Sequence, residues 1–232
     1  MPYFYIDTWY LILVLPAIII SLIASANVNS TFKKYSKVAS LRGTTGADAA
    51  RRVLEANGVF GVQIERVSGN LTDHFDPRTN TIRLSDGVYA STSVAAVGVA
   101  AHEAGHAVQY AESYAPMKLR SAIIPITNIG SNLAMPLVLL GIILSMPLLA
   151  DIGILAFSFS TLFQLVTLPV EFNASSRAIK AIEGFADDES EVKSAKKVLR
   201  AAAMTYVAAL AVSLANLLRL IMIVGGNNRR RN

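Results

Sequence analysis

The hydrophobic and polar positions of this chain are segregated into long segments. Three apolar stretches, residues 9–26, 122–170 and 198–224, contain few charged residues, and the polar positions gather mainly between residues 27 and 121. A helix needs about 20 apolar residues to cross the hydrocarbon core of a bilayer, and the middle stretch is long enough for two crossings. The pattern therefore predicts a mainly α-helical integral membrane protein with three or four transmembrane helices.

We divide the chain on this basis into five segments: an N-terminal transmembrane helix (1–26), a water-facing domain (27–121), a transmembrane helical hairpin (122–170), a second water-facing helical segment (171–198), and a C-terminal hydrophobic helix with a basic tail (199–232). We expect Asp151 to separate the two spans of the hairpin, and Pro125, Pro136 and Pro147 to kink the first span or to mark its ends. Complete crossing by the last segment is left open, because a charge deep in the bilayer, such as that of Arg219, costs on the order of 3 kcal/mol.

The first apolar stretch has two interpretations. Ala24-Ser25-Ala26 resembles a signal-peptide cleavage site, but no basic residue precedes the stretch, and Asp7 stands where a Lys or Arg would be expected. We therefore favour an uncleaved transmembrane helix. Four basic residues follow it closely: Lys33, Lys34, Lys37 and Arg42. Since Lys and Arg collect on the cytoplasmic side of a membrane helix, we expect an outer N-terminus and a water-facing domain in the cytoplasm.

The water-facing domain is expected to combine a helix with a short sheet. Thr44-Thr45-Gly46 is typical of a helix start, and Asn57-Gly58 of a helix end. Strand-like runs follow at residues 62–67, 71–75 and 81–85. A turn signal at Asp76-Pro77-Arg78-Thr79-Asn80 joins the last two runs into a hairpin. Such a hairpin either covers the domain core or offers its free edge to an extended peptide, and the strand pattern does not decide between these roles.

The next predicted helix carries the chemistry. Capping candidates at residues 91–93 precede an apolar run that contains His102, Glu103 and His106 in the order His-Glu-Ala-Gly-His. Residues four apart lie one turn above each other on a helix, so both imidazoles can bind one metal ion. Glu103 lies about 100° round the helix, where its carboxylate reaches a metal-bound water without replacing it. This spacing predicts a catalytic zinc site with Glu103 as the general base.

Composition restricts this site further. The chain has no cysteine, so zinc must be bound by His and carboxylate side chains. A catalytic zinc ion keeps three protein ligands, and His74 and Glu171 are the main candidates for the third. Each also has a structural interpretation, His74 as an exposed turn residue and Glu171 as an interfacial carboxylate that caps a helix. The net charge of +5 comes from Lys and Arg beside the apolar stretches, which indicates lipid headgroups rather than nucleic acid as a partner.

Three motifs resemble those of a known family: the His-Glu-Ala-Gly-His helix, the segment Glu171-Phe172-Asn173-Ala174-Ser175, and the run that begins at Leu71-Thr72-Asp73-His74. With them, nearly the whole chain resembles the YugP-type neutral zinc metallopeptidases, which are bacterial membrane proteins, and more distantly the gluzincin membrane proteases of the HtpX and CAAX prenyl protease group. The resemblance implies a zincin-like gluzincin core, a multi-pass protein of the bacterial plasma membrane, and one catalytic Zn²⁺ bound by His102, His106 and Glu171. Where the gluzincin relatives have an aspartate that supports a ligating histidine, this chain has Ser175, so Ser175 or Asn173 is expected in that role.

We therefore expect a zinc metalloendopeptidase in which Glu103 takes a proton from the attacking water and passes it to the leaving amine. Four residues are candidates for contacts to the oxyanion or substrate: His74, Arg177, Tyr206 and Arg219. Expected substrates are membrane proteins or their juxtamembrane segments. The alternatives are a proteolytically inactive scaffold that keeps zinc only to hold its helices together, and a metal-dependent hydrolase of lipid or another non-peptide substrate. The intact Glu103 argues against the scaffold, because a purely structural site needs no base.

Overall fold

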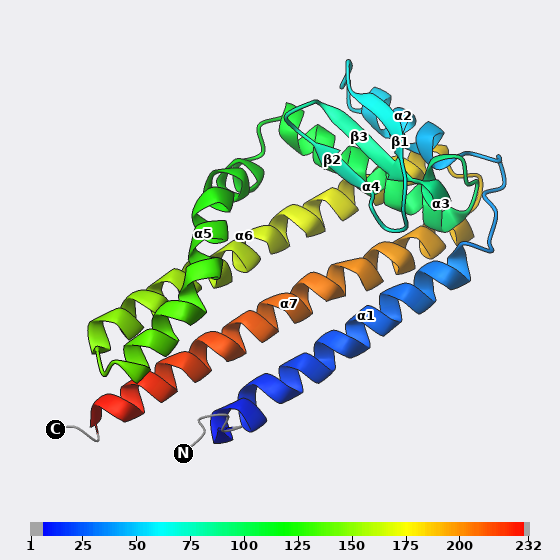
Figure 1. The fold of residues 1–232 in the computed structure, drawn as a ribbon. Helices are drawn as coiled ribbons and strands as arrows, with labels where there is room; N and C mark the ends of the chain where they lie inside the picture. The colour runs from blue at the N-terminus through cyan, green and yellow to red at the C-terminus, as the bar shows by residue number, and fades with distance from the viewer. Residues whose placement is uncertain (1–6, 230–232) are drawn as a thin grey trace. The chain divides into compact units, whose positions relative to one another are not determined.

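The computed structural model describes residues 7–229 and shows a mainly helical protein with one small sheet (Figure 1). Residues 1–6, and residues 230–232 of the predicted basic tail, lie outside the described residues. A π-helical turn, Tyr10–Val14, leads into the first helix. The elements then follow in this order: α1 (Leu15–Tyr35), α2 (Gly46–Ala56), β1 (Gln63–Val67), β2 (His74–Asp76), β3 (Thr81–Ser85), α3 (Asp86–Tyr89), α4 (Val94–Ala111), α5 (Ala115–Ile143), α6 (Pro147–Phe185) and α7 (Glu189–Arg229).

Four helices within residues 7–229 are long and apolar enough to cross a membrane. They comprise Tyr10–Tyr35, Ala115–Ile143, Pro147–Phe185 and Glu189–Gly226. The mainly α-helical class and the small sheet are therefore confirmed. Of the predicted three or four spans, four helices of the described chain qualify by length and composition.

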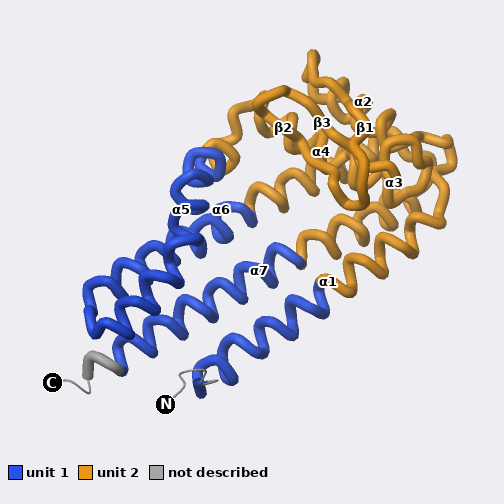
Figure 2. The backbone as a smooth tube through the Cα atoms, viewed as in Figure 1, with its two compact units in different colours: residues 1–24, 119–168, 205–232 blue, residues 25–118, 169–204 orange. Residues whose placement is uncertain are grey.

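Contacts within the chain divide it into two compact units (Figure 2). We call residues 1–24, 119–168 and 205–232 the helical unit, and residues 25–118 and 169–204 the mixed unit. The helical unit holds most of the apolar sequence, and the mixed unit holds the sheet and the His-Glu-Ala-Gly-His motif. No loop separates the predicted hairpin from the second water-facing segment, because α6 is one continuous helix of 39 residues.

Within the helical unit, the turn of the hairpin lies earlier than the sequence predicted. The expected break at Asp151 is wrong, because this residue lies inside α6. The turn contains Ser145, whose φ is 59°, and Pro147 begins α6, where a missing backbone N–H removes no helical hydrogen bond. Pro125 and Pro136 lie inside α5 rather than at its ends.

Small residues allow α5 and α6 to approach each other closely. A Cβ atom placed on Gly130 would lie 2.9 Å from the carbonyl oxygen of Ala156, and one placed on Gly153 would lie 2.8 Å from that of Ala134. Helices in a membrane gain stability mainly from such close backbone packing, because lipid tails are as apolar as the side chains. Glycine at these two positions therefore allows the two helices of the hairpin to pack without a steric clash.

The charge of Arg219 in the last apolar stretch has a partner within the same unit. The Nε and Nη2 atoms of Arg219 donate to Oδ2 of Asp7 at 2.8 and 2.6 Å. The guanidinium also lies 5.3 Å from the centre of the Tyr10 ring. A carboxylate partner removes much of the cost of placing an arginine in an apolar helix.

The core of the mixed unit forms around α4. Thr45 caps α2 as predicted, accepting a hydrogen bond from the backbone N–H of Asp48, and the apolar face of α2 packs on α4. The strand order is β1–β3–β2, with β3 parallel to β1 and antiparallel to β2. Ile82 and Leu84 of β3 are fully buried in this core. The predicted hairpin is confirmed, whereas the parallel pairing of β1 with β3 was not predicted, because no local turn signal specifies it.

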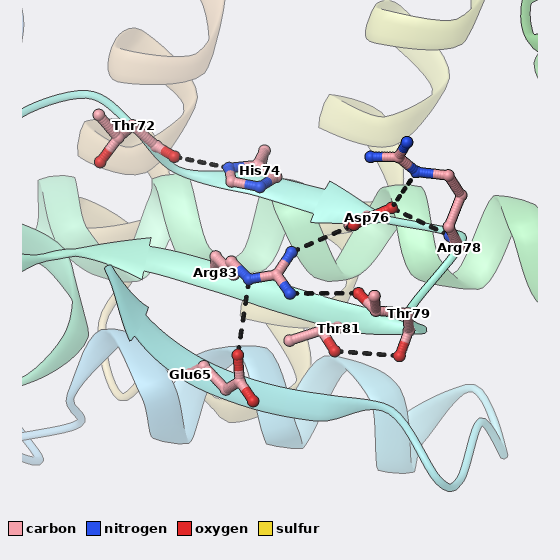
Figure 3. A network of polar contacts seen from close by, with 8 residues as sticks. All are labelled: Glu65, Thr72, His74, Asp76, Arg78, Thr79, Thr81 and Arg83. Atoms are coloured by element: carbon pink, nitrogen blue, oxygen red, sulfur yellow. Dashed lines mark hydrogen bonds and ion pairs between the residues drawn. The ribbon is translucent and has the colours of Figure 1, made fainter. Parts of the chain in front are cut away.

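Polar side chains lie on the face of the sheet opposite to Ile82 and Leu84 (Figure 3). Arg83 in the central strand donates to Asp76 at 3.2 Å and lies 3.5 Å from the carboxylate of Glu65, so it connects all three strands. The backbone N–H of Arg78 and the guanidinium of Arg83 lower the pKa of Asp76 to about 2. Apolar side chains on one face of the sheet thus pack against α4. On the other face, charge pairs connect the three strands to one another.

Candidate metal centre

The motif helix α4 begins and remains buried for reasons visible in its sequence. Ser93 is its N-cap, and the Ser93 hydroxyl accepts a hydrogen bond from the backbone N–H of Ala96 at 3.2 Å. Alanine, valine and glycine occupy most other positions, so neighbouring elements approach α4 closely on several sides. As the spacing predicted, His102 and His106 lie on one face, with ring centres 4.7 Å apart and an edge-to-face angle of 81°.

Helix α6 crosses α4 next to the two histidines. A Cβ atom on Gly105 would lie 2.7 Å from the carbonyl oxygen of Ala174, so only glycine permits this approach. The crossing places Glu171, one turn before Ala174, against the histidine face of α4. Glu171 is only 2 % exposed.

The two histidines and Glu171 form a compact cluster of donor atoms. Oε2 of Glu171 lies 3.2 Å from Nε2 of His102 and 3.5 Å from Nε2 of His106. Within residues 7–229 these three are the one group of His, Asp and Glu whose ligand atoms all lie within 4.8 Å of one another. Two atoms bound to one tetrahedral zinc ion at about 2.1 Å are themselves about 3.4 Å apart, so the two distances from Glu171 match the spacing of zinc ligands.

Gln109 orients His106 through hydrogen bonds that allow only one arrangement. Its side chain is fully buried, and Nε2 donates to the carbonyl oxygen of Val170 at 2.8 Å and to Oδ1 of Asn173 at 2.9 Å. A carbonyl oxygen can only accept, so the amide nitrogen must lie on that side and Oε1 must face Nδ1 of His106, 3.0 Å away. Nδ1 therefore carries a hydrogen, and Nε2 of His106 faces the cluster, where it donates to Glu171 when protonated and can bind a metal ion when deprotonated.

His102 has a corresponding support on α6. The hydroxyl of Ser175 lies 3.1 Å from Nδ1 of His102, within hydrogen-bonding distance. Nε2 of His102 faces Glu171, 3.2 Å from its Oε2, and is the nitrogen that a metal ion would bind once it is deprotonated. Ser175 thus contacts a histidine of the cluster directly, whereas Asn173 reaches the other histidine only through Gln109.

The electrostatic field of the cluster favours a cation. Burial alone would lower the pKa of His106, but its hydrogen bond with Glu171 and the negative charges of Glu103 and Glu171 raise this pKa above its ordinary value. Carboxylates that attract a proton to this position also attract a divalent metal ion. Glu103 adds its charge from the adjoining face of α4 and is only partly buried.

Arg177 lies at the far end of the Gln109 network. Its Nε donates to Oδ1 of Asn173 at 2.8 Å, and its Nη2 donates to Oε2 of Glu112 at 2.6 Å. The guanidinium therefore joins α6 to the C-terminal end of α4. Glu112 and Gln109 were both missed by the sequence analysis, although Gln109 could have been found as a buried polar residue one turn beyond His106 on the same helix face.

His74 is not part of the cluster. It pairs with Arg83 across the β2–β3 ladder, and directly opposed residues share one face of a sheet. That face carries the polar network (Figure 3). Phe75, the next residue of β2, points to the other face and contacts Tyr110 of α4. The His74 side chain is exposed, and its Nδ1 lies 2.7 Å from the carbonyl oxygen of Thr72. Among the described residues, Glu171 is thus the third donor beside the two histidines.

The fold and this cluster define a class: a mainly helical protein with four candidate membrane spans among its described residues and a His-His-Glu cluster, whose histidines lie on an HExxH helix and whose glutamate lies on a second helix. A family profile described as "Putative neutral zinc metallopeptidase" matches residues 10–225, and the chain belongs to that family. It is 49 % identical over 216 residues to the "Putative membrane protease YugP" of Bacillus subtilis (strain 168), covering 92 % of this chain and 96 % of that relative. No solved structure matches the chain.

Proposed function

We propose that this protein is a membrane-embedded zinc metalloendopeptidase with one Zn²⁺ bound by His102, His106 and Glu171. The observation that carries the proposal is the spacing of 3.2 and 3.5 Å between Glu171 Oε2 and the two imidazole Nε2 atoms, with both imidazoles oriented by partners on their Nδ1 side. Two neutral histidines and one carboxylate are a donor set typical of catalytic zinc. Three protein ligands leave the fourth position for water or substrate.

The residues of the chain have separate roles in the proposed reaction. When bound, zinc supplies an activated water and polarises the scissile carbonyl. Glu103, one residue after the first ligand, accepts the proton of that water and delivers it to the leaving nitrogen. Ser175 and Gln109 hold the imidazoles in the tautomer that binds metal. Arg177, which is engaged with Asn173 and Glu112, acts in this proposal by positioning α6 against α4.

The proposed substrate is an extended peptide that pairs with β2. This strand lies at one edge of the sheet, and the contact between Phe75 and Tyr110 holds it beside α4. Pairing along a free strand edge fixes a peptide backbone through main-chain hydrogen bonds. His74 is proposed as a substrate contact on this strand. We propose that this arrangement is a gluzincin core, that it faces the cytoplasm at the bacterial plasma membrane, and that its substrates are membrane proteins.

The test combines zinc content with cleavage of an unfolded model protein in detergent. We expect Glu103→Gln to keep about one zinc per chain and to lose cleavage, since it removes the base but no ligand. Glu171→Ala should lose zinc as well. Glu55→Gln, which changes an exposed carboxylate on α2, is the matched control and should behave as wild type.

Two results would contradict the proposal. If the wild type binds zinc but cleaves no peptide under any condition, the protein is a zinc-binding scaffold. If it cleaves lipid and not protein, and does so only without chelator, the centre is a hydrolase of another class. Activity that survives complete removal of metal would exclude the metal mechanism.

A further inference from the structure

We infer that a groove between α6 and α7 in the mixed unit binds the headgroup of an anionic phospholipid. The groove has a volume of about 690 Å³. Its walls combine the cationic side chains of Lys180, Lys196 and Arg200 with the apolar side chains of Phe172 and Leu199. The inference does not depend on the proposed peptidase activity.

The groove has an excess of positive charge. Glu183 is the one carboxylate among its lining residues, against three cations. None of the three cations lies within 4.0 Å of a carboxylate in the part of the chain that the structure describes, although other exposed cations, such as Lys193, form such pairs. Lys180, Lys196 and Arg200 are all exposed. Their charges are therefore available to a ligand, and the complementary ligand is an anion.

The position of the groove along the two helices indicates a lipid. α6 leaves its apolar segment at Val170, two residues before Phe172, and the apolar stretch of α7 begins at Val198, two residues before Arg200. The three cations lie within about three helical turns of these points, where headgroups meet the hydrocarbon core. An anionic phospholipid matches both halves of the lining, with its phosphate at the cations and its acyl chains toward the apolar end.

The groove also reaches the metal centre. Ser175 contributes to its lining, and the hydroxyl of Ser175 lies 3.1 Å from Nδ1 of His102. A headgroup in the groove would thus lie beside the residue that supports a histidine of the cluster. An acidic protein segment is the competing occupant, but it would pair only with the cations and would leave the apolar end of the groove without an apolar partner.

The experiment uses the full-length protein, stripped of lipid in a neutral detergent and then supplied with phosphatidylglycerol or phosphatidylcholine. Native mass spectrometry measures the lipid that each sample retains. We expect preferential retention of phosphatidylglycerol, and an affinity about tenfold lower in the double variant K196Q/R200Q, because each cation near an anionic headgroup contributes severalfold. The control K37Q/K197Q removes the same charge from exposed positions outside the groove and should change the affinity less than about twofold.

Several results would overturn the inference. Equal losses in the two double variants would show diffuse surface charge rather than a site. Equal retention of phosphatidylcholine and phosphatidylglycerol would show that the cations of the groove do not select an anionic headgroup. Binding of a hexaglutamate peptide that K196Q/R200Q abolishes, together with no specific lipid retention, would assign the groove to an acidic segment. Circular dichroism and zinc content show that each variant is folded, and neither readout requires peptidase activity.

Discussion

Gly105 and Ala174 meet backbone to backbone where α4 crosses α6, and a Cβ atom on Gly105 would lie 2.7 Å from the carbonyl oxygen of Ala174. Gly105 precedes His106 on α4, and Ala174 lies one turn after Glu171 on α6, so this contact adjoins the cluster. The separation of the two helices at this point sets the distances between the three donor atoms. A glycine with no ligand atom is therefore part of the geometry of the centre.

Gly105→Ala should separate α4 from α6 and move Glu171 away from the histidines. We expect the free energy of unfolding to fall by about 1–3 kcal/mol, as for other overpacked interiors, and zinc to bind more weakly. Thermal unfolding and zinc titration measure the two effects. Gly184→Ala is the control, because a Cβ atom there meets no atom within 4 Å. An unchanged zinc affinity in Gly105→Ala would show that the crossing does not control the centre.

Gln109→Leu should leave Nδ1 of His106 without its acceptor and the carbonyl oxygen of Val170 without its side-chain donor, while Asn173 keeps its hydrogen bond from Arg177. Loss of a hydrogen bond that orients a ligand typically costs about 10–100-fold in metal affinity, and buried unpaired polar groups cost about 1–3 kcal/mol. Competition with a fluorescent zinc chelator gives the affinity. The exposed Gln63→Leu is the matched control. The assigned orientation of His106 is contradicted if Gln109→Leu binds zinc like the wild type.

Ser175→Asp should strengthen the metal centre, because a carboxylate is a better acceptor than a hydroxyl for the Nδ1 hydrogen of His102. We expect zinc to bind about tenfold more tightly. Ser175→Ala should bind it more weakly than the wild type. Ser176→Ala, on the next residue of α6, controls for general effects of substitution there. If all three variants bind zinc equally, Ser175 does not support His102.

Arg219→Gln should destabilise the helical unit by leaving Asp7 without its partner. The pair is about one fifth exposed, so we expect a loss of about 1–2 kcal/mol, below the 3–5 kcal/mol typical of fully buried pairs. Asp7→Asn should cost a similar amount, and the double variant should cost less than the sum of the two. Thermal unfolding in detergent measures all three. Strict additivity would mean that the ion pair contributes nothing to stability.

Much of the molecule follows from local sequence. The lengths of the apolar stretches specify helices that can span a membrane, because a bilayer sets a minimum length for such a helix. The caps Thr45 and Ser93 mark helix starts, since their side chains satisfy free backbone N–H groups. The spacing of His102 and His106 places both on one helix face through the helical period alone.

Other features depend on which segments meet in space. Local sequence did not show that Ser145, rather than Asp151, marks the hairpin turn, because packing of α5 on α6 decides where the helices end. The choice between His74 and Glu171 required the strand register, which turns His74 to the outer face of the sheet. Gln109 acquires its role only when α6 brings Val170 and Asn173 to it. Local sequence thus specifies the helices, the candidate spans and the spacing of the two histidines, whereas the third donor and the groups that orient the two histidines come from tertiary contacts, which join residues more than 60 positions apart.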